Sequence, residues 1–174
     1  MQDILNKASQ IRLVIFDVDG VLTDGTLLYG PQGEELKAFS AHDGHGIKML
    51  AASGVGCALL SGRRSAAVAA RAAELGIQMV LQGVEDKLAF FHTLIREKGL
   101  QPEHTGYMGD ELVDLPVLTR CGFACAPREA PEAVRTRVHY VAAAAAGRGA
   151  VREVCELLMR AQRTLDAAVG KYLA

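Results

Sequence analysis

Groups that could do chemistry follow the apolar runs of this sequence. Two carboxylates follow the first run, a hydroxyl and a guanidinium the second, an ammonium the third and a carboxylate the fourth. Carboxylates at close quarters raise each other's pKa, and a hard divalent cation such as Mg²⁺ relieves that repulsion while it also binds phosphate oxygens. The set therefore predicts a magnesium-dependent site for a phosphate group. In chain order its members are Asp17, Asp19, Ser61, Gly62, Arg63, Lys87 and Asp110.

Each of these residue types fits a step of phosphoryl transfer. An ionised Asp beside a cation can attack phosphorus and form an aspartyl phosphate, and Asp17 is the candidate nucleophile. Asp19, two residues on, can protonate the leaving oxygen and then activate the hydrolytic water. Lys87 can offset charge on the transferring oxygens. The hydroxyl of Ser61, with the backbone amides of the turn at Gly62, can cradle the phosphate.

The apolar runs alternate with helical patterns, which predicts strands and helices in alternation. Such a pattern is typical of a parallel sheet with helices on both faces, a Rossmann-like α/β fold. Because open parallel sheets bind ligands at the carboxyl ends of their strands, we expect the candidate residues to gather at one edge. The predicted strands are 11–18, 55–61, 77–82, 105–110, 122–126 and 138–142, and the predicted helices are 46–53, 65–75, 84–99, 130–137 and about 149–168.

One region, about 21–40, breaks this alternation. Turn signals occur at 24–25 and 30–33, and short extended arms at 26–29 and 35–39 flank the second turn, which predicts a projecting β-hairpin. Its arm Leu27-Leu28-Tyr29 is apolar and needs a second surface, either another subunit or its own domain. About 41 residues separate Asp19 from Ser61, too few for a cap domain beside the hairpin and a helix. We therefore expect one capless domain over residues 1–174.

Composition narrows the partners and the location. The formal net charge is -1, which argues against a nucleic-acid partner. No apolar stretch reaches the roughly 18–20 residues of a membrane helix, and we expect no signal peptide. The four cysteines show no metal-binding spacing and are interpreted as packing residues. We expect a cytoplasmic protein that does not contact membranes.

The motifs, taken together, resemble those of the haloacid dehalogenase superfamily. The run F-D-V-D-G-V-L-T-D-G at 16–25 resembles its first motif. Ser61 resembles the second, Lys87 the third, and Gly109-Asp110 with Asp114 the fourth. The resemblance implies that Asp17 is the nucleophile and Asp19 the general acid–base. It also implies that Asp17, the backbone carbonyl of Asp19 and Asp110 hold Mg²⁺, and that Ser61 and Lys87 contact the phosphoryl group.

A narrower resemblance covers nearly the whole chain. The segments D-G-x-G-I-K-M-L (43–50), L-S-G-R (60–63) and G-R-G-A-V-R-E (147–153) are similar to the family of 3-deoxy-D-manno-octulosonate 8-phosphate phosphatases. This resemblance implies a sugar-acid phosphate as substrate and a homotetramer in which the hairpin and the C-terminal tail help close a neighbour's site. Arg63 and Arg152 are candidate substrate contacts.

Two departures and three alternative functions accompany this interpretation. Glu111 stands where the family usually has a second Asp, and His42 where an Arg is expected to bind a carboxylate. The alternatives are a phosphatase for nine-carbon nonulosonate 9-phosphates, a dehalogenase, and a non-enzymatic module for oligomerisation or phospho-acceptor switching. A panel of phosphorylated sugars would separate the two phosphatases, metal dependence would identify a dehalogenase, and turnover that Asp17→Asn abolishes would exclude the non-enzymatic module.

Overall fold

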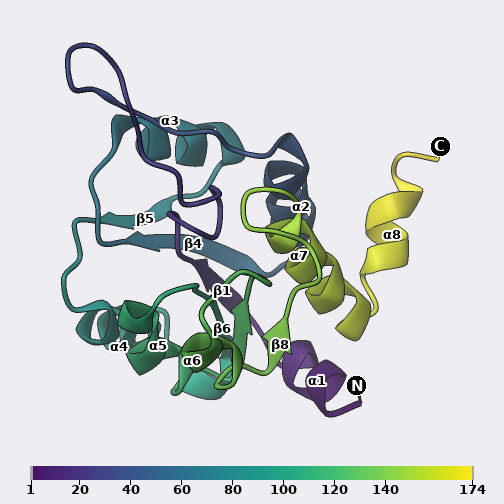
Figure 1. The fold of residues 1–174 in the computed structure, drawn as a ribbon. Coiled ribbons are helices and arrows are strands. Elements are labelled where there is room, and N and C mark those ends of the chain that lie inside the picture. The colour runs from purple at the N-terminus through teal and green to yellow at the C-terminus, as the bar shows by residue number, and fades with distance from the viewer. Residues whose placement is uncertain (1, 174) are drawn as a thin grey trace.

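A six-stranded parallel sheet forms the centre of the computed structural model, which describes residues 2–173 (Figure 1). The strand order is β5-β4-β1-β6-β7-β8, and every neighbouring pair is parallel. The parallel α/β architecture predicted from the sequence is confirmed. The strands are β1 (Leu13–Phe16), β4 (Gly56–Ser61), β5 (Met79–Gln82), β6 (Thr105–Met108), β7 (Phe123–Ala126) and β8 (Tyr140–Val141).

The side chains of β1 explain why helices cover both faces of the sheet. Successive side chains of a strand face opposite ways, so Val14 and Phe16 enter one apolar core and Leu13 and Ile15 the other. Helices α1, α2, α3 and α7 cover the first core, and α4, α5 and α6 cover the second (Figure 1). Among residues 2–173, no helix is both long and apolar enough to cross a membrane. The helices are α1 (Gln2–Ser9), α2 (Ala41–Ala52), α3 (Ala66–Leu75), α4 (Lys87–Glu97), α5 (Leu115–Leu118), α6 (Glu132–Arg135) and α7 (Ala150–Ala161), with 3₁₀ turns at η1 (Pro102–His104) and η2 (Leu112–Asp114).

The C-terminal segment differs from its prediction. The single helix expected over about 149–168 is wrong, because the chain forms α7 and then a separate helix α8 (Leu165–Gly170). Between them Arg163 adopts a left-handed conformation with φ 59°. The amide of Thr164 donates to the carbonyl of Met159 at 2.8 Å, and the Gln162 side chain donates to the carbonyl of Ile11 at 2.7 Å. These bonds close the end of α7 and turn the chain.

A short hairpin leaves the sheet after β1 and returns to α2. Its strands β2 (Leu28–Tyr29) and β3 (Glu35–Leu36) pair antiparallel, with Leu28 opposite Leu36. In Figure 1 it is the dark loop that projects farthest from the sheet, on the side of α3. It lies at the place where the sequence predicts a hairpin, and its apolar side chains at Leu28, Tyr29 and Leu36 are exposed.

The connections create a crevice beside β1. From β1 the chain moves outward through β4 to β5, then crosses back and adds β6 on the other side of β1. Helices leave the carboxyl ends of neighbouring strands toward opposite faces at such a switch point, and ligands bind there. Asp17 directly follows β1 and Asp110 lies two residues after β6, so the topology brings both to this crevice.

Candidate active site

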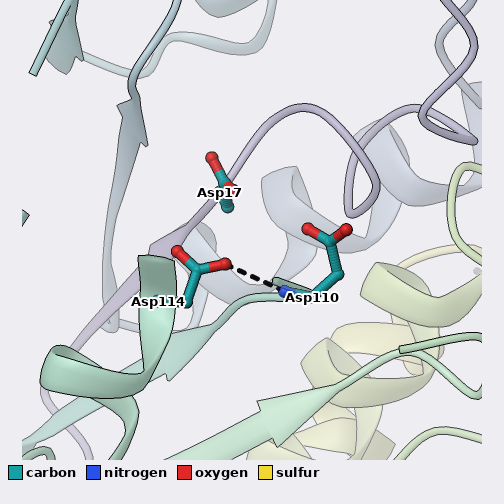
Figure 2. Close-up of side chains that lie close together, drawn as sticks. All are labelled: Asp17, Asp110 and Asp114. Atoms are coloured by element: carbon teal, nitrogen blue, oxygen red, sulfur yellow. Dashed lines mark hydrogen bonds between the residues drawn. The ribbon is translucent and has the colours of Figure 1, made fainter. Parts of the chain in front are cut away.

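Three carboxylates converge at the carboxyl ends of β1 and β6. Oxygen atoms of Asp17, Asp110 and Asp114 all lie within 4.8 Å of one another (Figure 2). The backbone amide of Asp17 donates to the carbonyl of Met108 at 2.9 Å, which extends the β1–β6 pairing to the nucleophile candidate itself. The backbone of Asp17 is therefore fixed by the sheet.

Asp114 is buried and uses both of its oxygens within the protein. One oxygen accepts hydrogen bonds from Lys87 Nζ at 2.7 Å and from the Tyr107 hydroxyl at 2.6 Å. The other accepts from the backbone amides of Asp110 and Glu111, each at 3.1 Å. Asp114 thus orients the loop after β6 and the lysine. With its oxygens committed in this way, it is a weaker candidate for a metal ligand than Asp17 or Asp110.

Lys87 is a buried ammonium between two of the carboxylates. Its Nζ lies 2.8 Å from Asp17 Oδ2 and 2.7 Å from Asp114 Oδ1. The residue begins α4, whose N-terminus is capped by the Asp86 side chain accepting from the amide of Ala89 at 2.9 Å. Burial disfavours the charged lysine, but the two carboxylates outweigh it and raise its pKa. Lys87 is therefore a fixed positive charge beside Asp17.

The carboxylates carry more negative charge than Lys87 can balance. Burial raises the pKa of Asp17 to about 6, and the charge of Asp114 adds to this while Lys87 opposes it. Burial, followed by the charges of Asp17 and Asp114, raises the pKa of Asp110 to about 7. Asp110 Oδ1 is buried with no hydrogen-bond partner, which is costly in a folded protein. This electrostatic situation is one that a bound cation would relieve.

The donor set fits a hard divalent cation. All available ligands are oxygens, from Asp17, Asp110 and the backbone, the set that Mg²⁺ prefers. Gly20 leaves space for Asp110, since a Cβ at this glycine would lie 2.1 Å from Asp110 Oδ2. Gly20 also has φ +83°, a conformation that side chains disfavour. The residues present therefore fit a magnesium ion held chiefly by Asp17 and Asp110.

Asp19 takes a different position from the other predicted residues. Its carboxylate is not one of the three that converge, and it forms an ion pair with Lys37, which follows β3. Lys37 has no distinguishing signal in the sequence, because a lysine in a predicted hairpin arm resembles any solvated charge. The side chains of Asp17, Lys87 and Asp110 therefore gather at one edge of the sheet, as expected. Asp19 faces the hairpin instead.

The second predicted motif lies at the end of β4. Ser61 is buried, and its hydroxyl accepts from the backbone amide of Arg63 at 3.1 Å, which forms a tight turn through Gly62. The Arg63 guanidinium faces the hairpin and donates to Glu35 Oε2 at 2.8 and 3.2 Å and to the Tyr29 hydroxyl at 3.0 Å. Arg63 thus joins the β4 loop to the hairpin.

Arg152 lies on α7, where that helix packs against α2. Its Nε donates to Glu156 at 2.5 Å, and its backbone amide donates to the carboxylate of Asp43. It is not among the residues that contact the three carboxylates. His42 and Glu111, the two residues that differ from the family's usual motifs, are both exposed. His42 lies on α2, and Glu111 caps the short helix η2 through a 2.6 Å hydrogen bond from the amide of Leu112.

A cavity of about 380 Å³ opens beside Asp110. Its lining includes Gly20, Asp24, Glu111 and Arg148. A larger cavity of about 620 Å³ lies at the opposite edge of the sheet, near Gly56, and is remote from the carboxylates. The smaller cavity is therefore the one that adjoins the candidate active site.

Known proteins of similar sequence match nearly the whole chain. No protein-family model matches the chain. The 3-deoxy-D-manno-octulosonate 8-phosphate phosphatase KdsC of Yersinia pestis is 45% identical over 168 residues, which cover 97% of this chain and 90% of that protein. The enzyme of the same name from Escherichia coli K12 is 45% identical over 171 residues, covering 98% and 91%.

Two solved structures are close to this fold. A probable YrbI family phosphatase from Pseudomonas syringae is 47% identical with a TM-score of 0.98, and the match covers 100% of this chain and 99% of that one. A 3-deoxy-D-manno-octulosonate 8-phosphate phosphatase from Moraxella catarrhalis, solved with magnesium, phosphate and KDO, is 41% identical with a TM-score of 0.97 and 99% coverage of both chains.

Proposed function

This chain belongs to the family of 3-deoxy-D-manno-octulosonate 8-phosphate (Kdo-8-phosphate) phosphatases in the haloacid dehalogenase superfamily, and from that premise we propose how its residues divide the reaction. It is a phosphoric monoester hydrolase that releases Kdo and inorganic phosphate, and Mg²⁺ is its cofactor. The single observation that supports the division of roles is the position of Asp17, whose carboxylate lies between Lys87 and Asp110 at the switch point of the sheet.

In the first half-reaction Asp17 attacks the phosphorus atom. A bond forms between a carboxylate oxygen of Asp17 and phosphorus, and the bond to the sugar oxygen breaks. Protonated Asp19 gives its proton to that oxygen as it leaves and becomes ionised. Lys87 offsets charge on the transferring oxygens, and bound Mg²⁺ neutralises charge on the phosphoryl group.

In the second half-reaction the aspartyl phosphate is hydrolysed. Asp19, now ionised, takes a proton from a water molecule that attacks phosphorus, and Asp17 is released as a carboxylate. The Ser61 hydroxyl and the backbone amides at Gly62 are the proposed contacts for the phosphate oxygens. Arg63 is the proposed contact for the sugar acid, and Arg152 stays a prediction that the kinetics of Arg152→Ala would check.

The experiment measures phosphate release from Kdo-8-phosphate and from a nonulosonate 9-phosphate, each with Mg²⁺. We expect a higher kcat/KM with the eight-carbon substrate and a loss of about 10⁴-fold or more in Asp17→Asn. Asp3→Asn, an exposed aspartate on α1, is the matched control and should behave as the unaltered chain does. Retained turnover in Asp17→Asn would contradict the nucleophile assignment. A higher kcat/KM with the nonulosonate 9-phosphate would contradict the preference for the eight-carbon substrate.

Assembly and location are part of the same proposal. We propose that the chain is one capless domain and forms a homotetramer, supported by the exposed apolar hairpin residues Leu27, Leu28, Tyr29 and Leu36. Light scattering would measure the mass, and Leu28→Ser with Leu36→Ser should lower it if the hairpin is an interface. A cytoplasmic location is supported by the cysteines, all four of which are free and buried.

A further inference from the structure

Lys37 is a buried ammonium within an otherwise exposed hairpin. Its side chain is only 1% exposed, although neighbouring Leu36 is 53% exposed. A lysine loses much side-chain freedom and hydration when it is buried, so a buried lysine needs partners. Lys37 has two: the carboxylate of Asp19 and Glu35 Oε1 at 2.8 Å.

These contacts belong to a longer series of alternating charges. Asp19 pairs with Lys37, Lys37 with Glu35, and Glu35 with Arg63 at 2.8 Å. The adjacent Lys37 ammonium and the hydrogen bonds from Arg63 lower the pKa of Glu35 to about 2, so it stays ionised. The series runs from the end of β1, through the base of the hairpin, to the loop after β4. The ion pair with Glu35, which Arg63 holds in turn, fixes the position of the Lys37 ammonium.

The position of Asp19 makes this fixed ammonium significant. The Asp19 side chain is 21% exposed, and Lys37 is its ion-pair partner among the described residues. A general acid must be held close to its target geometry, because a misplacement of about 1 Å can cost about 10²-fold in rate. Without Lys37 the Asp19 carboxylate would be free to rotate toward solvent.

We propose that Lys37 is a positioning residue that holds the carboxyl group of Asp19 in place for proton transfer, both in its protonated form as the acid and in its ionised form as the base. The inference rests on the proposed function, in which Asp19 is the general acid–base. Lys37 does not touch the reacting atoms in this account and acts only through Asp19. Two consequences distinguish it from a residue that merely stabilises the hairpin.

The first consequence concerns the leaving group. A sugar alkoxide leaves poorly unless it is protonated, whereas para-nitrophenolate leaves without a proton. Because kcat/KM covers the steps up to the first irreversible one, it reports the transfer to Asp17 for both substrates. Lys37→Met should lower kcat/KM for Kdo-8-phosphate by about 10²-fold and for para-nitrophenyl phosphate by less than about threefold.

The second consequence is non-additivity. If Lys37 acts only through Asp19, Lys37→Met should cause no further loss in an Asp19→Asn background. Lys37→Arg, which keeps the charge, should recover part of the activity lost in Lys37→Met. Lys48→Met is the matched control, since Lys48 is exposed on α2. Lys37→Gln keeps a hydrogen-bond donor and replaces the methionine variant if that one does not fold.

The outcomes separate this inference from the function on which it rests. Equal losses on both substrates, multiplicative losses in the double variant, or higher activity in Lys37→Met would each overturn the role of Lys37 while hydrolysis by the unaltered chain upholds the function. If the unaltered chain hydrolyses neither substrate with Mg²⁺, the function fails and the inference fails with it. Retained hydrolysis of para-nitrophenyl phosphate in Lys37→Met also shows that the variant is folded.

Discussion

The carboxylate of Asp43, near the start of α2, accepts a 2.8 Å hydrogen bond from the backbone amide of Arg152, near the start of α7. Its second oxygen accepts from the amide of Gly149 at 3.2 Å. Asp43 therefore caps a helix that begins more than a hundred residues later in the chain, at an end where a negative charge is favourable. The cap also compensates for two arginines at the start of α7, Arg148 and Arg152, which would otherwise be unfavourable there.

Removing this cap should destabilise the protein. Asp43→Ala leaves two amides at the start of α7 without an acceptor, and we expect a loss of about 2–3 kcal/mol of unfolding free energy. Urea unfolding followed by circular dichroism would measure it. His42→Ala changes the exposed neighbouring residue and should have little effect. A stability of Asp43→Ala equal to that of His42→Ala would contradict the capping role.

Lys87→Met should impair both stability and turnover. The substitution leaves Asp17 and Asp114 facing each other without their shared cation, and breaking a buried ion pair costs about 3–5 kcal/mol. Differential scanning calorimetry would show the lower melting temperature, and phosphate release would show the lost activity. Lys98→Met, at the exposed lysine that follows α4, is the control. If Lys87→Met melts at the same temperature as that control, the charge of Lys87 does not stabilise the fold.

Tyr107→Phe, which removes another donor to Asp114, should impair stability and activity less than Lys87→Met does. Burial, with the charges of Asp114 and Asp17, raises the pKa of Tyr107, so its hydroxyl remains a donor to Asp114 at 2.6 Å. Its loss should cost about 1–3 kcal/mol, while activity falls less than in Lys87→Met because the lysine still holds Asp114. Thermal melting and kcat/KM would be measured together, with the exposed Tyr172→Phe for comparison. A complete loss of activity would assign the hydroxyl a direct part in the chemistry.

Metal removal should make stability depend on pH. In the metal-free protein the pKa values of Asp17 and Asp110 are raised from 3.8 to about 6 and about 7. Between about pH 4 and pH 7 the folded state thus binds protons that the unfolded chain has released, so stability falls as pH rises through this range. Urea midpoints of the chelated protein at about pH 5.5 and about pH 8 would measure the difference.

Mg²⁺ should reverse this trend. At about 100 times its dissociation constant, a ligand that binds only the folded state adds about 2.7 kcal/mol. At a fixed Mg²⁺ concentration the gain should be larger at the higher pH, where both carboxylates are ionised and the dissociation constant is lower. Asp110→Asn should reduce both the pH dependence and the gain from Mg²⁺. A chelated protein that becomes more stable as pH rises would contradict the account of the carboxylates.

The fold was largely predictable because β1 and its neighbours are buried on both faces. A strand covered by helices on two sides must be apolar at every position, and Leu13 through Phe16 are. The end of α7 was not predictable, because Arg163 carries no sequence signal for a left-handed conformation. The break depends on the Gln162 side chain reaching the carbonyl of Ile11, a contact across more than 150 residues.

The site was predictable where a residue's place follows from the strand before it. Asp17 directly follows β1 and Asp110 lies two residues after β6, so the topology alone brings them together. Tyr107 was hidden because a tyrosine inside an apolar run is most simply a core residue. The partner of Asp19 was hidden because it depends on how the hairpin folds back, which residue types at 21–40 do not specify.

The close approach of Gly20 to Asp110 has a consequence for how this scaffold can diversify. A methyl group at position 20 would force the Asp110 carboxylate to turn away and would strain a backbone at φ +83°. Position 20 thus cannot accept a side chain without disturbing a carboxylate that is expected to hold the ion. Changes that adapt the scaffold to other phosphate esters are expected elsewhere, in the hairpin and at other residues around the cavity.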